Sequence, residues 1–173
     1  MAEIKVPFHR ASITKAEEDA VLEVLRSGWL TTGKYALEFE KKFSEAIKDS
    51  PEVSITRQKF GMDERQPLSL AVNSNTSGMI LAMEACGVKE GTAVITTPYT
   101  FVSTAACARH LKADVFFADI EKDSYNIDPD KIEEILKKDM ENGRKVRAIV
   151  PVHIAGNICN MKRIVELAKK YST

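Results

Sequence analysis

One segment combines residue types that bind an anion with the position that such a site needs. The stretch 73–78 (NSNTSG) follows a short apolar run and opens a helical pattern. Free backbone N–H groups and the positive dipole end at a helix N-terminus attract phosphate, and the hydroxyls of Thr76 and Ser77 would add donors. The same residue types are preferred helix caps, so a purely structural cap explains the segment as well. No GxxxxGK[ST] pattern occurs, which excludes a nucleotide P-loop.

Two further segments follow strand-like apolar runs and carry side chains suited to a ligand. In the stretch 97–101 (TPYTF), the ring of Phe101 could stack on a planar cofactor. Packing of that ring under its own helix is the simpler explanation of the same residue. His153 follows the run 148–152, where its imidazole could donate to a ligand or stabilise a loop.

The N-terminal part predicts two helices and a loop. Thr14 and Glu17 have the spacing of a capping box, and they predict a helix that ends at Gly28. Apolar residues recur at spacings of three or four from position 36 to 47 and predict a second helix that begins near Lys34. The segment 49–67 is polar and contains Pro and Gly breakers, which indicate an exposed loop or insertion.

From position 68 onward, short apolar runs alternate with helical patterns. The predicted strands are 70–72, 93–96, 114–118 and 147–152, and the predicted helices are 77–86, 102–110, 129–138 and a last one capped by Asn160. Asp128 followed by proline is a typical helix start. Strands joined through helices must pair in parallel, so we predict one α/β domain over 1–173, a mainly parallel sheet with helices on both faces. Ligands of such sheets bind beyond the carboxyl ends of the strands.

Composition excludes several classes of partner. Lys and Arg together number 25, as do Asp and Glu, so no global charge draws the chain to nucleic acid or an anionic membrane. No stretch has the roughly 20 apolar residues that span a bilayer, and residues 1–10 lack the apolar core of a signal peptide. Three widely spaced cysteines without a CxxC pair indicate reduced thiols in a cytoplasmic protein and no metal site.

In order and spacing, these segments resemble the sugar aminotransferase (DegT/StrS) family of fold-type I pyridoxal phosphate (PLP) enzymes. The matching stretches cover nearly the whole chain: 27–33 (SGWLTTG), 39–40 (FE), 73–77 (NSNTS), 94–102 (VITTPYTFV), 125–128 (YNID) and 151–156 (PVHIAG). Each motif is weak alone, whereas the ordered set is specific. The resemblance implies a partial PLP-transferase large domain preceded by N-terminal helices.

The resemblance also implies a cofactor site. Asn75, Thr76 and Ser77 would hold the PLP phosphate, and Phe101 would stack on the pyridine ring. Asn75 stands where the family usually has Gly, and because Asn tolerates a left-handed backbone, we expect the tight turn to persist.

The substrate implied by the resemblance is a keto sugar linked to a nucleotide, aminated from an amino acid such as glutamate during polysaccharide biosynthesis. Trp29, Thr31 and Thr32 would contact that nucleotide sugar at the interface of a homodimer. His153 would lie near the pocket floor. No residue of the chain receives a catalytic role.

The family places two further residues after the region matched here, an aspartate that pairs with the pyridine nitrogen and a lysine that binds the cofactor. The 173 residues therefore correspond to the N-terminal half of the family pattern, and we expect them to be inactive alone. Alternatives remain open: a related PLP-dependent sugar dehydratase, a non-catalytic or split-gene subunit that binds a complementing C-terminal half, or a complete domain for another phosphorylated ligand.

Overall fold

The structure is a computed structural model that describes residues 7, 10–49, 69–143 and 145–173. The chain forms two compact units, Met1–Ala71 and Val72–Thr173, where the sequence predicted one domain. Apart from Asp49, the predicted loop 49–67 lies outside the described residues. None of the helices in the described ranges combines the length and the apolar composition of a membrane-spanning segment.

The first unit contains two helices whose ends follow local capping rules. Helix α1 (Lys15–Ser27) begins after Thr14, whose hydroxyl and backbone N–H form the predicted capping box with Glu17. It ends at Gly28, whose φ of 70° is the left-handed conformation that glycine adopts without steric cost. Helix α2 (Lys34–Ile47) has the predicted bounds. Neither helix buries a residue within the described structure, so their apolar faces are open.

The predicted strand 70–72 is wrong. This segment and the residue before it bind helix α2 instead of a neighbouring strand. The N–H of Ala71 donates to the Glu40 carboxylate over 2.8 Å, and the hydroxyl of Ser69 donates to the Glu40 carbonyl over 3.0 Å. Leu70 is 76% exposed. An apolar run becomes a strand only where a partner completes its hydrogen bonds, and the described residues place none beside it.

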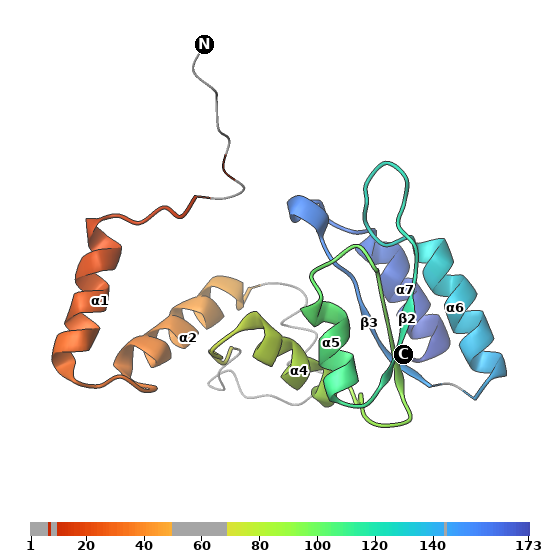
Figure 1. The fold of residues 1–173 in the computed structure, drawn as a ribbon, viewed down its shortest axis with the longest axis horizontal. Coiled ribbons are helices and arrows are strands. Elements are labelled where there is room, and N and C mark those ends of the chain that lie inside the picture. The colour runs from red at the N-terminus through yellow and green to blue at the C-terminus, as the bar shows by residue number, and fades with distance from the viewer. Residues whose placement is uncertain (1–6, 8–9, 50–68, 144) are drawn as a thin grey trace, which may run out of the picture. The chain divides into compact units, whose positions relative to one another are not determined.

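The second unit is built on a three-stranded parallel sheet of order β2-β1-β3, whose outer strands β2 and β3 are labelled in Figure 1. Strands β1 (Ala93–Thr96), β2 (Asp114–Phe117) and β3 (Val146–Val150) pair in parallel, with β1 in the centre. Parallel strands need crossover connections, which here contain α5 (Ser103–His110) and α6 (Pro129–Glu141). The α/β class and the parallel sheet predicted from the sequence are therefore confirmed.

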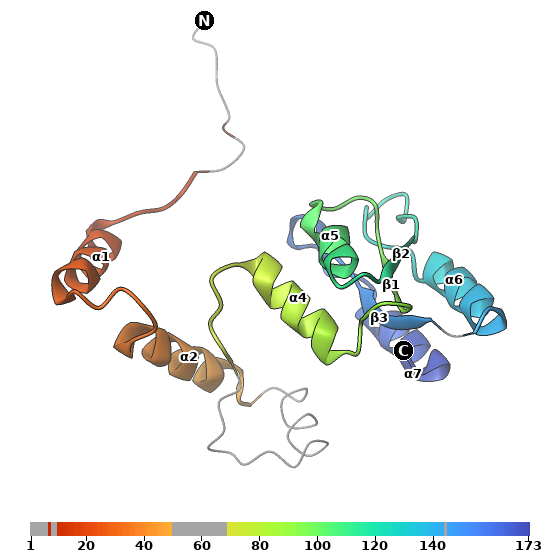
Figure 2. The ribbon, with the colours of Figure 1, turned by 60° about the horizontal axis from the view of Figure 1, so that its bottom comes forward.

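Helices cover both faces of this sheet (Figure 2). Side chains of β1 alternate between two cores: Val94 packs with the cluster under α4 (Asn75–Ala85) and α5, whereas Ala93 and Ile95 pack with the cluster under α6 and α7 (Met161–Tyr171). All three side chains are fully buried. The period of two along a strand thus divides the unit into two apolar layers.

Two carboxylates fix the layer formed by α6 and α7. Asp139, at the end of α6, accepts from the N–H groups of Lys145 and Val146 and so anchors the start of β3. Glu133 accepts from three side chains of α7, those of Arg163, Lys170 and Tyr171, over 2.6–3.0 Å. The Glu133 side chain is only 12% exposed, and the bonds from Lys170 and then Tyr171 lower its pKa from 4.5 to about 2.

The lowered pKa of Glu133 predicts a pH-dependent contribution to stability. A carboxylate with a depressed pKa stabilises the folded state above its ordinary value of 4.5, and this contribution disappears as the pH falls towards 2. Glu133→Gln should therefore lower the melting temperature at pH 7, and the difference from wild type should shrink below pH 4.5. Glu141→Gln, at an exposed position on the same helix, is the control. A difference that stays constant across this pH range would contradict the assignment.

Candidate functional site

The topology of the second unit brings three segments to one edge of the sheet. Because the strands are parallel, the loops that follow β1 and β3 leave from the same carboxyl edge. Helix α4 leads into the start of β1, so it runs opposite to that strand and its N-terminus points towards the carboxyl edge. The predicted cofactor residues and His153 therefore belong to one edge of one unit.

The N-terminus of α4 has the features of an anion site. Ser74 caps the helix: its hydroxyl accepts from the N–H of Ser77 over 3.1 Å, and its carbonyl accepts from the N–H of Gly78. Within the described residues, the N–H groups of Asn75 and Thr76 have no acceptor. No acidic residue lies in the first turn. Two free donors at the positive end of a helix are suited to a phosphate.

This geometry refines two predictions about the segment. The backbone N–H of Ser77 donates to Ser74, a residue not among the predicted site residues, so Ser77 can offer a ligand only its hydroxyl, which lies 3.0 Å from the Ser74 hydroxyl. The spacing of Ser74 and Ser77, typical of a helix cap, could have identified it. Asn75 is the first residue of α4 and is not among the left-handed residues of the described structure, so the expected left-handed turn at this position is wrong.

A buried thiol holds the first turn of α4 against its neighbour. The Sγ of Cys107, on α5, donates to the carbonyl of Thr76 over 3.5 Å. Burial raises the pKa of the Cys107 thiol, which keeps it protonated and able to donate. Sequence patterns could not have found this contact. They place Cys107 on a helix but do not show that its thiol meets the carbonyl of Thr76, 31 residues away.

The loop after β1 carries the aromatic residues predicted there. Phe101 is 75% exposed, so its ring does not pack under α5 as the simpler explanation required. Thr97 is fully buried and its hydroxyl accepts from the N–H of Tyr99, which fixes the turn. The rings of Tyr99 and Tyr125 lie 5.9 Å apart. An exposed ring on a fixed loop can stack on a planar ligand.

His153 lies in a loop that side-chain hydrogen bonds hold in a strained shape. Its Nδ1 accepts from the N–H of Cys159 over 3.2 Å, so the proton of the neutral ring is on Nε2. Asn126, 2% exposed, accepts from the N–H of Ile154 and donates to the carbonyl of Asn157. Between them, Ala155 has a φ of 52°, a left-handed conformation that is rare outside glycine. Asn126 belongs to the matching stretch 125–128, but sequence patterns assign it no role because its partners lie about 30 residues away.

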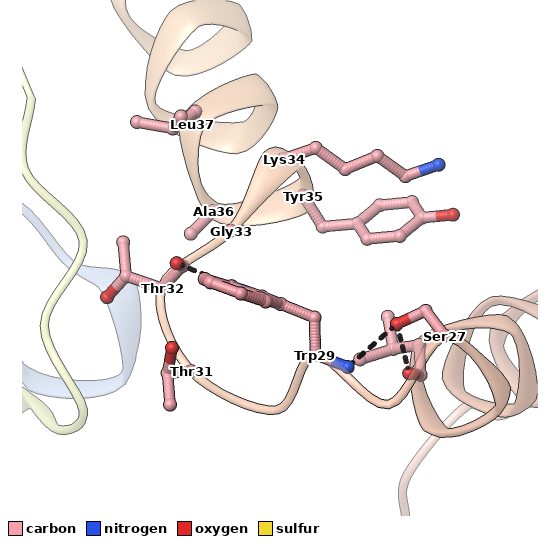
Figure 3. A pocket seen from close by; sticks show the side chains of 10 residues that line it. Ser27, Trp29, Thr31, Thr32, Gly33, Lys34, Tyr35, Ala36 and Leu37 are labelled. Carbon is pink, nitrogen blue, oxygen red and sulfur yellow. Dashed lines mark hydrogen bonds between the residues drawn. The ribbon is translucent and has the colours of Figure 1, made fainter.

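The remaining predicted residues, Trp29, Thr31 and Thr32, lie in the first unit. They line a pocket of about 600 Å³ at the turn between α1 and α2 (Figure 3). Their role in binding a substrate stays a prediction. In the described part of the chain, no group of three or more His, Cys, Asp or Glu side chains could hold a metal ion.

The bonds of Asn126 predict a sizeable cost when its side chain is removed. Asn126→Ala would remove two part-buried hydrogen bonds, those to the Ile154 N–H and the Asn157 carbonyl, which should lower the free energy of unfolding by about 1–3 kcal/mol. Urea unfolding would measure this change, and amide hydrogen exchange at Ile154 should become faster. Asn142→Ala, which removes one exposed bond to Lys138, is the matched control and should cost less. Equal costs for the two variants would contradict the role of Asn126.

Known proteins are similar to this chain in sequence and in fold. Residues 11–173 match the DegT/DnrJ/EryC1/StrS aminotransferase family. The spore coat polysaccharide biosynthesis protein SpsC of Bacillus subtilis is 35% identical over 96% of this chain and 37% of its own length. Among solved structures, the PLP-form of Spr1654 from Streptococcus pneumoniae matches with a TM-score of 0.77 and 27% identity, over 96% of this chain and 37% of that one.

A third relative is PseC of Helicobacter pylori, an aminotransferase involved in the biosynthesis of pseudoaminic acid. It matches with a TM-score of 0.70 and 29% identity, over 93% of this chain and 38% of its own. The chain thus spans somewhat more than a third of the length of these relatives. The family match covers nearly all of its residues and agrees with the fold and the motifs. The chain belongs to the DegT/DnrJ/EryC1/StrS aminotransferase family.

Proposed function

We propose that this chain contributes the cofactor-phosphate site of a PLP-dependent aminotransferase that acts on a keto sugar linked to a nucleotide. The observation that carries the proposal is the N-terminus of α4, where the N–H groups of Asn75 and Thr76 are free in the described structure and no carboxylate opposes an anion. The family uses PLP, and Spr1654 has been solved in its PLP-form.

The residues present fit this cofactor. The phosphate would accept from the N–H groups of Asn75 and Thr76 and from the hydroxyls of Thr76 and Ser77. The exposed ring of Phe101 would cover one face of the pyridine ring, and the Nε2–H of His153 would offer a donor at the same edge of the sheet. When bound, PLP supplies an electron sink for the transfer of an amino group. This chain's part is to bind and orient it.

The nature of the relatives supports a sugar as the amino acceptor. SpsC is a spore coat polysaccharide biosynthesis protein and PseC acts in the biosynthesis of pseudoaminic acid. Trp29, Thr31 and Thr32 would contact the nucleotide-linked sugar, with an amino acid such as glutamate as the donor. We place the reaction in the cytoplasm, where free thiols such as Cys107 and Cys159 persist.

Binding of pyridoxamine 5′-phosphate to the chain tests the cofactor site. This amine form cannot make an imine with surface lysines, so calorimetry reports only the non-covalent site. Thr76→Val with Phe101→Ala should raise the dissociation constant at least tenfold, because a lost hydrogen bond to a charged group costs about 1.5–3 kcal/mol. Phe43→Ala, an exposed ring of the first unit, is the control. Unchanged affinity in the double variant, or no binding by wild type, would contradict the placement.

We propose a partner as well, either a second copy in a homodimer or a complementing C-terminal half. Large apolar side chains of both helices of the first unit are exposed, among them those of Val21, Leu25, Leu37 and Phe39. Exposed apolar surface of this kind favours association. Sedimentation of the chain should show larger species as its concentration rises, and a single monomeric species at every concentration would contradict this expectation.

A further inference from the structure

Trp29 is held in one position although most of its surface is open. Its indole N–H donates to the carbonyl of Thr32 over 2.9 Å, and its backbone N–H donates to the Ser27 hydroxyl over 3.2 Å. That hydroxyl in turn donates to the carbonyl of Val24, at the end of α1. The side chain is nevertheless 64% exposed. Figure 3 shows the indole lying along the backbone of residues 32–33, where it forms one side of the pocket.

Gly33 leaves the space that the indole occupies. A Cβ atom at position 33 would lie 2.6 Å from Cδ1 and 2.9 Å from Nε1 of Trp29, closer than real Cβ contacts allow. The backbone itself does not require glycine, since its φ of −148° and ψ of −162° are extended values that any residue adopts.

The place of Gly33 just before α2 also points to the contact with Trp29. It is the N-cap of α2, and it makes no side-chain capping bond. Ser, Asp and Asn are preferred at an N-cap because their oxygen atoms accept from a free N–H of the first turn. The chain lacks this stabilisation at a position where the backbone would permit it. The contact with Trp29 explains why.

We infer that Gly33 is a positioning residue, which fixes the Trp29 indole as a rigid wall of the pocket at 24–37. A flat, immobile aromatic face is suited to stacking on a ring of the ligand at little cost in conformational entropy. That this ligand is the nucleotide-linked sugar rests on the proposed function. The placement of the indole by Gly33 does not.

Fluorescence can test the inference directly, because Trp29 is the single tryptophan of the chain. In the wild-type chain, time-resolved anisotropy should decay with the tumbling of the protein, since the indole is held. Gly33→Ala should add a fast component, because the added methyl group displaces the indole from the Thr32 carbonyl. Gly78→Ala makes the same chemical change where the Cβ meets Val72 at 3.4 Å, an ordinary contact, and should leave the decay unchanged. An identical decay in Gly33→Ala and wild type would overturn the inference.

A double-mutant cycle separates this role from a backbone effect. Urea unfolding followed by circular dichroism should show a lower midpoint for Gly33→Ala in the wild-type background. In the Trp29→Ala background the same change should have no cost, because the methyl group then has space and alanine restricts the unfolded chain. An equal cost in both backgrounds would mean that Gly33 serves the backbone alone and would overturn the inference. Neither measurement uses a ligand, so failure of pyridoxamine 5′-phosphate to bind would count against the proposed function only.

Discussion

The parallel pairing of β1 on both of its edges is the constraint on which the second unit depends. This strand is fully buried, and it separates two apolar layers that the helices cover. Because its neighbours run in the same direction, each connection must return across a face of the sheet, and every loop that follows a strand begins at one edge. The same rule directs the N-terminus of α4 towards that edge. The candidate site is therefore a consequence of how the core is assembled.

Side-chain hydrogen bonds, rather than the sheet, determine the shape of the loops at this edge. Asn126 and Cys159 hold the loop of His153, and Ser74 shapes the first turn of α4. No buried side-chain nitrogen or oxygen atom in the described residues lacks a hydrogen-bond partner. Loops fixed in this way present donors in set directions before a ligand arrives, and this reduces the entropy lost on binding. The left-handed Ala155 fits such a site, since backbone strain persists only where surrounding bonds enforce it.

The first unit uses the same principle with an aromatic side chain. Its helices are defined by their caps and their apolar periods. The turn between them depends on a side-chain hydrogen bond, from the indole of Trp29 to the carbonyl of Thr32. The indole of Trp29 satisfies its own N–H within the turn and leaves a broad face open. A ring held in this way offers a flat apolar face that is suited to stacking on a planar ligand.

Features that depend on nearby residues could be predicted from the sequence alone. Thr14 and Asp128 cap their helices as predicted, the central strands lie where apolar runs occur, and the ordered motifs identified the family. Three features became visible only in the folded chain: the run 70–72 is not a strand, Phe101 is exposed, and Asn126 fixes the loop of a distant histidine. The difference lies in how far along the chain the interacting groups are separated. A cap or a helical period is complete within one or two turns of chain. The partners of β1 lie 21 and more than 50 residues away, and those of the Asn126 amide lie 28 and 31 residues away, so local patterns do not specify them.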